Sequence, residues 1–346
     1  MSAAEIRCGV VGTGHLGRLH ARILSELPGA RLAGVVDAVP ERAEAAAREY
    51  RCAACPTIEA LLAQDIRFAV VATPTERHYE VGRALLAAGV ATLIEKPFTR
   101  TIEEADGLIE AARASAGGFV GVGHVERFNP VVQAARRHVR DPLFIECDRV
   151  HPFSFRSMDV GVVLDLMIHD LDLVHWLAGG RMVDLEAVGA SVLSGFEDMA
   201  FARLRFSNGC TALLRASRVS LRKVRKLRIF CENLYVSLDY LARTGMKIRV
   251  KEGAPARLAA LAAEGPPSLP FADFLDIEDL AVEEAEPLRA ELEAFVGAVR
   301  DGAPPPVGGE VGREALACAL RIGEAIQRHQ ASVREMRSGL TSQPFE

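Results

Sequence analysis

Apolar and polar positions alternate over the first 124 residues in a pattern that predicts strands followed by helices. Short runs of aliphatic residues predict strands at residues 6–12, 32–36, 68–72, 91–94 and 119–123. Apolar residues recur at helical spacing in the segments between them, which predict helices at residues 15–27, 40–50, 57–63, 76–88 and 102–115. Strands that alternate with helices lie parallel and need crossover connections. This part of the chain therefore predicts a doubly wound parallel α/β sheet.

The pattern changes near residue 143. One long helix is predicted at residues 160–178, and it is followed by strand-like runs without helices between them, at residues 184–193, 200–206, 211–219, 226–231, 235–240 and 246–250. Such a succession predicts an open, mostly antiparallel sheet. Residues 253–284 are rich in Ala, Pro and Glu and predict a surface excursion, and two helices are predicted at residues 287–300 and 313–329.

These patterns predict two domains, at residues 1–124 and 125–346, with the last helix able to pack back on the first domain. A long antiparallel sheet with one face free of helices often dimerises, so we expect a homo-oligomer.

Composition narrows the class of protein. Of the 346 residues, 49% are hydrophobic and 25% are charged, as in ordinary globular domains. A net charge of -5 argues against broad nucleic-acid binding, which needs a basic face. No apolar run approaches the roughly 18 residues of a membrane span, and the first residues lack the features of a signal peptide, so we expect a cytoplasmic protein.

Seven cysteines are scattered along the chain, and Cys52 and Cys55 form a single C-x-x-C. A zinc or redox site would need a second pair or a thioredoxin-like setting. We therefore expect reduced, partly buried thiols and no metal.

A glycine-rich motif follows the first predicted strand. Residues 12–17 read Gly-Thr-Gly-His-Leu-Gly, and a helix is predicted directly after them. In this setting G-x-G-x-x-G permits a tight turn and lets backbone amides approach a pyrophosphate at the helix N-terminus. Asp37 ends the next strand, twenty residues after Gly17, where a carboxylate accepts hydrogen bonds from an adenosine ribose. The alternative is a glycine-rich turn with an unrelated aspartate.

The motif predicts a dinucleotide cofactor, and Asp37 favours NAD because a carboxylate would repel the 2′-phosphate of NADP; nearby Arg42 could soften that preference. The cofactor-binding residues expected from it are Gly12, Thr13, Gly14, His15, Leu16, Gly17 and Asp37.

Two segments offer groups that could move the proton of an alcohol. Glu95-Lys96-Pro97 follows the strand at residues 91–94, at the sheet edge where ligands bind. Lys96 could exchange protons there, although an exposed strand-end lysine is an equal alternative. The predicted helix at residues 159–178 places Asp165, His169, Asp172 and Trp176 on one face, at spacings of four, three and four. The alternatives for this face are a metal site or a structural histidine.

Together these motifs resemble the glucose-fructose oxidoreductase/inositol dehydrogenase (Gfo/Idh/MocA) family. The resemblance rests on the glycine motif, Ala72-Thr73-Pro74 followed by His78, Glu95-Lys96-Pro97, and Asp165-x-x-x-His169, in this order along almost the whole chain. It implies a Rossmann domain followed by a substrate-binding and oligomerisation domain, at residues 125–346, with an open, mostly antiparallel sheet. It also implies that Lys96 contacts the reacting hydroxyl and the nicotinamide ribose, that His169 is the acid/base, and that Asp165 positions the substrate. Thr73, Pro74, His78, Glu95 and Lys96 would line the nicotinamide half of the cofactor site.

Three further segments, at residues 123–130, 159–165 and 235–241, are similar to the UDP-N-acetylglucosamine 3-dehydrogenase subgroup of this family. That resemblance implies NAD-dependent oxidation of the 3-hydroxyl of a sugar nucleotide. The 3-oxo product would feed an aminotransferase, for example in lipid A or envelope glycan synthesis. Gly161-Val162 departs from the paired glycines that many family members carry ahead of the Asp-x-x-x-His helix.

Substrate-binding residues implied by the resemblance and by the charge pattern are Lys96, His124, Arg127, Asn129, Arg149, Arg156, Asp165 and His169. The three arginines suit a diphosphate, because guanidinium groups bind phosphate with two hydrogen bonds, but salt-bridging surface arginines are an equal alternative. The basic run at residues 222–226 is interpreted mainly as a solvated hairpin, with phosphate contact as the alternative. Competing functions are a dehydrogenase of another sugar or inositol and a non-catalytic NAD-sensing protein on the same fold.

Overall fold

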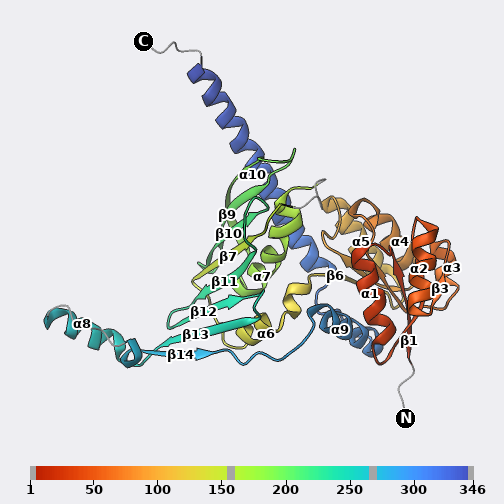
Figure 1. Cartoon of the computed structure of the whole chain (residues 1–346), viewed down its shortest axis with the longest axis horizontal. Helices are drawn as coiled ribbons and strands as arrows, with labels where there is room; N and C mark the ends of the chain where they lie inside the picture. Colours follow the sequence, from red (N-terminus) through yellow and green to blue (C-terminus); the bar gives the residue numbers. More distant parts are fainter. Residues whose placement is uncertain (1–4, 154–159, 265–270, 342–346) are drawn as a thin grey trace. The chain divides into compact units, whose positions relative to one another are not determined.

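The computed structural model describes residues 5–153, 160–264 and 271–341, and the chain divides into two compact units (Figure 1). The first unit comprises Met1–Phe128 and Ala285–Cys318, and the second comprises Asn129–Glu284 and Ala319–Glu346. A late segment of the chain therefore belongs to the first unit, which starts with the predicted cofactor domain.

The first unit contains a six-stranded sheet in which every pair of neighbouring strands is parallel. Its strands are β1 (Ile6–Val11), β2 (Ala30–Val36), β3 (Ala53–Ala54), β4 (Phe68–Val71), β5 (Ala91–Glu95) and β6 (Val120–Gly123). The helices are α1 (His15–Glu26), α2 (Pro40–Tyr50), α3 (Ile58–Leu62), α4 (His78–Ala87) and α5 (Ile102–Ala114), with short 3₁₀ turns η1 (Thr75–Arg77) and η2 (Val125–Phe128). The strand order β3-β2-β1-β4-β5-β6 is that of a Rossmann domain, so the predicted doubly wound sheet is confirmed.

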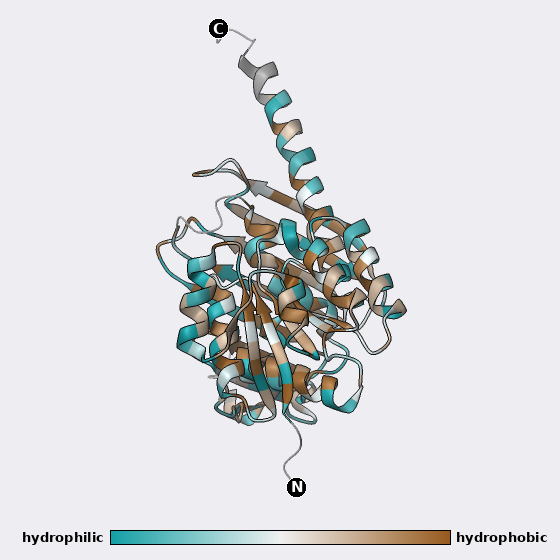
Figure 2. Ribbon diagram, turned by 90° about the vertical axis from the view of Figure 1, so that its right-hand side faces the viewer, coloured by the Kyte–Doolittle hydropathy of each residue, from teal (hydrophilic) through white to brown (hydrophobic). Residues whose placement is uncertain are grey.

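Helix α9 (Pro287–Asp301) supplies part of the core of this unit. The ring of Phe295 lies edge-on against Phe68 on β4 and Phe119, with ring centroids 5.7 and 5.4 Å apart. Just after α9, Gly308 pairs with Gly121 on β6. Figure 2 shows the strands of this unit as mainly hydrophobic, while hydrophilic positions concentrate on outward turns of the helices.

The second unit contains an eight-stranded sheet with the order β14-β13-β12-β11-β7-β10-β9-β8. Its strands are β7 (Phe144–Val150), β8 (Met182–Ala190), β9 (Met199–Phe206), β10 (Thr211–Ser217), β11 (Val224–Phe230), β12 (Leu234–Asp239), β13 (Thr244–Val250) and β14 (Leu275–Asp279). All neighbouring strands are antiparallel except β7 and β10. The predicted mostly antiparallel sheet is therefore confirmed.

Helices α6 (Pro130–Arg136) and α7 (Ile168–Ala178) contact this sheet. Along β9, Ala200, Ala202 and Leu204 are buried while Phe201 and Arg203 between them are exposed, so one face of the sheet is covered and the other is open. The unit also contains the π-helical turn η3 (Val163–Met167), the 3₁₀ turn η4 (Phe271–Asp273) and α8 (Ala254–Glu264), and α10 (Gly309–Thr341) contributes its later turns to it.

Some sequence expectations need correction. The excursion predicted at residues 253–284 contains α8 and also β14, which pairs antiparallel with β13 and forms cross-strand ion pairs such as Lys247–Glu278. The acidic residues of β14 do not resemble a strand in the sequence. They are tolerated in the sheet because lysines on or next to the partner strand compensate their charge. The basic run at residues 222–226 is only partly a turn, since β11 begins at Val224. The last helix begins earlier and ends later than predicted. Among the described residues, no helix is sufficiently long and apolar to span a membrane.

Candidate functional site

The glycine-rich turn connects β1 to α1 as the motif predicts. Gly12 has a φ of +89°, and a Cβ on this residue would lie 2.7 Å from the carbonyl oxygen of Ala72. A Cβ on Gly17 would lie 1.7 Å from the carbonyl oxygen of Gly12, so only glycine permits this approach of helix to turn. Gly14, the N-cap of α1, has open space at its Cβ position, and no side chain caps the helix. The first amides of α1 are therefore available for a phosphate group.

Asp37 lies at the end of β2, beside this turn. Its Oδ2 accepts hydrogen bonds from the backbone N–H of Thr13 at 2.6 Å and from the Thr13 hydroxyl at 2.9 Å, while Oδ1 accepts from Val39 N–H at 2.9 Å. Burial alone would raise the pKa of Asp37, but the hydrogen bonds from Val39 and Thr13 outweigh it and the pKa is lowered. The carboxylate is thus held ionised and oriented at the turn, as a ribose-binding group requires.

A cavity of about 850 Å³ runs along this edge of the first unit. The predicted cofactor residues among those that line it are Gly12, Gly14, His15, Leu16, Asp37, Thr73 and Pro74. The side chain of Leu16 is 41% exposed and offers an apolar surface there. The glycine cradle, the ionised Asp37 and a cavity of this size together fit a dinucleotide.

His78 connects two loops of the first unit. Its Nε2 lies 2.9 Å from the carbonyl oxygen of Thr73, and its Nδ1 lies 3.0 Å from that of Pro97. Since the imidazole is 1% exposed, we interpret it as a clamp that holds the loop after β4 next to the loop after β5. The family resemblance places His78 near the nicotinamide. The contacts of its imidazole indicate that it would shape this part of the cofactor site by holding the loops of Thr73 and Pro97 together.

Glu95 ends β5, and its carboxylate is bound by a residue that the sequence did not indicate. Oε1 of Glu95 lies 2.8 Å from Nε2 of His20 on α1, and Oε2 accepts the backbone N–H of Lys96 at 3.1 Å. Burial alone would raise the pKa of Glu95, but the hydrogen bond and charge of His20 and the charge of Lys96 lower it overall. His20 lies one helical turn after Gly17 on α1, so the sequence could have placed it on the buried face of the helix, toward the sheet edge at which β5 ends.

In the second unit, Asp165 and His169 are carried by consecutive helical segments. Asp165 lies in the π-helical turn Val163–Met167, and His169 is the second residue of α7. The predicted single α-helix is thus replaced by a π turn at its start, a feature frequent at functional sites. Both side chains are partly exposed, whereas Asp172 on the same predicted face is 1% exposed.

The predicted substrate-binding residues have diverse environments. Arg149 is buried and forms a two-hydrogen-bond ion pair with Asp170 on α7, at 2.8 Å for each contact, which argues against a role in binding a diphosphate. Asn129 caps α6 by accepting the N–H of Val131 at 3.3 Å. His124 and Arg127 are buried in the first unit. Arg156 lies outside the described residues.

No metal centre is apparent within residues 5–153, 160–264 and 271–341, since no group of three or more His, Cys, Asp or Glu side chains is arranged to hold an ion.

Comparison with known proteins agrees with this geometry. A family model described as an oxidoreductase family with an NAD-binding Rossmann fold matches residues 6–124, and the GFO/IDH/MocA C-terminal domain matches residues 132–236. The UDP-N-acetylglucosamine 3-dehydrogenase of Acidithiobacillus ferrooxidans is 39% identical over 326 residues, which are 93% of this chain and 98% of that protein. An inositol 2-dehydrogenase of Rhizobium meliloti is 26% identical over 95% of this chain and 99% of its own length.

Solved structures give the same result. A crystal form of the A. ferrooxidans enzyme superimposes with a TM-score of 0.84 at 37% identity, covering 94% of this chain and 99% of that one. Levoglucosan dehydrogenase in complex with NADH and levoglucosan shares the fold, with a TM-score of 0.78 at 18% identity over 94% and 98% of the two chains. The chain therefore belongs to the Gfo/Idh/MocA family of NAD-binding oxidoreductases.

Proposed function

We propose that this protein oxidises the 3-hydroxyl of a UDP-N-acetylglucosamine-type sugar nucleotide to the 3-oxo sugar. The observation that carries the proposal is 39% identity, over 93% of the chain, to an enzyme named for that reaction. Lys96, Asp165 and His169, which the family resemblance marks as the reactive set, are all present. A protein that only senses NAD has no need of such a proton-transfer set.

The chemistry divides between the cofactor and the chain. NAD, when bound, supplies the acceptor for the hydride. The glycine turn and Asp37 hold the cofactor in the first unit. We assign to Lys96 a hydrogen bond to the reacting oxygen, which strengthens as negative charge develops there. His169 takes the hydroxyl proton, since an imidazole titrates near pH 6.5 in water, and Asp165 orients the substrate.

The arginine assignments follow from the ion pair of Arg149. Because Arg149 is committed to Asp170, the diphosphate role passes to Arg127 and Arg156, with His124 and Asn129 proposed at the sugar. An alanine variant of a true diphosphate ligand would raise the KM for the sugar nucleotide and leave NAD binding nearly unchanged.

The decisive experiment is a screen of sugar nucleotides in which NADH absorbance is followed, with and without an aminotransferase that removes the keto product. Activity with UDP-N-acetylglucosamine, increased by the aminotransferase, is expected. Activity with none of the sugar nucleotides would refute the proposal. The screen includes myo-inositol, because inositol 2-dehydrogenases are also among the full-length relatives.

The wider setting is part of the same proposal. A 3-oxo sugar nucleotide is a substrate for transamination, so an aminotransferase would consume the product, for example in lipid A or envelope glycan synthesis. A cytoplasmic location is proposed because all seven cysteines are free thiols, which suits a reducing compartment.

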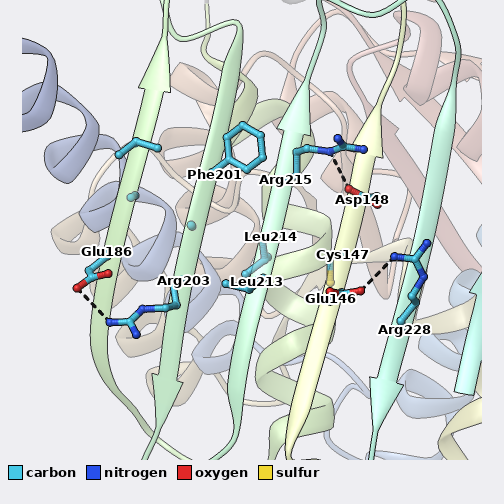
Figure 3. Close-up of a pocket in the computed structure, with 13 residues that line it drawn as sticks. Glu146, Cys147, Asp148, Glu186, Phe201, Arg203, Leu213, Leu214, Arg215 and Arg228 are labelled. Carbon is cyan, nitrogen blue, oxygen red and sulfur yellow. Dashed lines mark hydrogen bonds and ion pairs between the residues drawn. The ribbon is translucent and has the colours of Figure 1, made fainter. Parts of the chain in front are cut away.

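We also propose that the open face of the eight-stranded sheet joins a second copy of this chain. Figure 3 shows Phe201 and Leu213 on this face among charged residues. These residues line a hollow of about 420 Å³. Phe201 is 42% exposed and Leu213 is 40% exposed, and the charged side chains around them form ion pairs within the chain, so the face offers a second copy exposed apolar groups among neutralised charges. Light scattering would test this: a homo-oligomer is expected, and Phe201→Glu should dissociate it.

A further inference from the structure

The loop between β8 and β9 is built around one buried carboxylate. Asp198 is fully buried. Its Oδ2 accepts the backbone N–H groups of three consecutive residues, at 2.7 Å from Val192, 2.6 Å from Leu193 and 2.9 Å from Ser194. Burial alone would raise the pKa of Asp198, but these hydrogen bonds and its ion pair with Arg218 lower it well below its usual range. The loop therefore has a defined conformation.

Arg218, directly after β10, ties this loop to the segment that precedes the helix of Asp165 and His169. Its guanidinium donates from Nε to Asp198 at 2.7 Å, from Nη2 to the Ser194 hydroxyl at 2.8 Å, and from Nη1 to the carbonyl oxygen of Val160 at 2.9 Å. Because Arg218 is 2% exposed, these charge-assisted hydrogen bonds are shielded from water.

Glu197, next to Asp198, reaches the start of that helical segment. Its backbone carbonyl accepts the N–H of Val162 at 3.0 Å, and its Oε1 accepts the N–H of Val163 at 3.2 Å. The first amides of a helix have no partners within the helix, and a carboxylate at this end is also favoured by the helix dipole. Glu197 therefore caps the π-helical turn from outside the segment.

This cap accounts for Gly161, the one glycine of the Gly161-Val162 segment, in which Val162 departs from the paired glycines of many family members. A Cβ on Gly161 would lie 1.8 Å from Oε1 of Glu197, so a side chain would displace the carboxylate from its place. The carbonyl oxygen of Gly161 in turn accepts the N–H of Asp165 at 3.1 Å. The conformation of the turn thus depends on a contact with residues more than thirty positions away in the sequence.

We propose that Glu197 is a positioning residue for the reaction: by capping Val163, it holds the π-helical turn that places Asp165 and His169. This inference rests on the proposed function, because it takes these two residues to act on the substrate. Glu197 itself contacts neither of the reacting groups in this assignment; it acts through the backbone of the turn. Misplacing a reacting group by about 1 Å can cost up to about a hundredfold in rate.

The test compares Glu197→Ala with Glu197→Gln. Glu197 is partly exposed, so both variants are expected to fold. Alanine removes the acceptor for Val163 N–H, whereas the glutamine amide oxygen keeps it. We expect Glu197→Ala to lower kcat by about ten- to a hundredfold, and Glu197→Gln to recover most of the loss. The dissociation constant of NAD should not change in either variant. Glu232→Ala, an exposed glutamate in the β11–β12 turn, is the matched control and should behave as wild type.

Hydrogen exchange separates this inference from the proposed function, since it needs no substrate. Peptides covering residues 162–167 should exchange faster in Glu197→Ala and recover protection in Glu197→Gln. Unchanged exchange, an unchanged kcat in Glu197→Ala, or a glutamine variant as impaired as the alanine variant would each overturn the inference. A wild-type enzyme that oxidises none of the substrates screened would instead refute the proposed function.

Discussion

The ion pair between Arg149 and Asp170 can decide between a structural and a substrate-binding role for this arginine. Arg149 lies on β7 and Asp170 on α7, and each side chain is only 2% exposed. Nε and Nη2 of the guanidinium lie 2.8 Å from the two carboxylate oxygens, and the ring of Tyr240 lies 5.6 Å from its central carbon. The pair therefore joins the helix of the proposed catalytic residues to the sheet.

The perturbation is Arg149→Met, alone and combined with Asp170→Leu. The single change leaves a buried carboxylate without its cation, and breaking such a pair costs about 3–5 kcal/mol. Replacing both partners by apolar residues removes both buried charges, and such replacements are often close to neutral. We therefore expect the double variant to be more stable than Arg149→Met, with a coupling free energy of about 3 kcal/mol or more.

Urea unfolding followed by tryptophan fluorescence is a suitable assay, because Trp176 on α7 is the single tryptophan of the chain and reports on the second unit. The exposed pair Arg137–Glu283 of the second unit serves as a control, and Arg137→Met should cost less than about 1 kcal/mol. KM for the sugar nucleotide should be unchanged in the folded double variant. If Arg149→Met is as stable as wild type but raises this KM, Arg149 binds substrate and our interpretation is wrong.

Three other predictions concern the first unit and the proton. Asp37→Ala should weaken NAD binding by about ten- to a hundredfold, the worth of one charged hydrogen bond, and weaken NADP binding less; similar dissociation constants of wild type for the two coenzymes would contradict the role of Asp37. Lys96→Met and His169→Ala should each lower kcat by about a hundredfold or more. In wild type kcat/KM should rise between about pH 6 and 8, and this rise should be lost in the variant that lacks the base. NAD affinity should fall far less in His169→Ala than in Lys96→Met, and full activity in both variants would refute the catalytic assignment. His20→Leu leaves the buried Glu95 carboxylate without its imidazole partner and should lower the free energy of unfolding of the first unit by about 1–3 kcal/mol at pH 7. Circular dichroism would measure this loss, and His20→Gln should recover part of it. An unchanged unfolding midpoint in His20→Leu would show that this hydrogen bond contributes nothing to stability.

Local patterns were sufficient to predict five of the six strands of the Rossmann sheet, whereas the two-residue strand β3 was not predicted. These five strands are short apolar runs, and the crossover helices between them have clear periodicity. The turn at residues 12–17 needs glycine for reasons confined to a few neighbouring atoms, such as the approach of Gly17 to the Gly12 carbonyl. Asp37 could be placed because parallel strands end at one edge of the sheet, so its position follows from strand order alone.

Features that depend on contacts between distant segments could not be predicted in this way. The burial of Arg149 against Asp170, the binding of Glu95 by His20, and the capping of Val163 by Glu197 each join residues separated by twenty or more positions.

The sequence around an arginine, a histidine or a glutamate looks the same whether the side chain contacts solvent, substrate or a buried partner. Which of these it meets is determined by the face of the helix or strand that the fold covers. Helix α9 is a further case. Its amphipathic pattern predicts a helix but does not indicate which core the helix joins, and the contact between Phe295 and Phe68 shows that it joins the core of the first unit. Periodicity and turn chemistry are properties of neighbouring residues, whereas burial and partner choice depend on the whole tertiary arrangement.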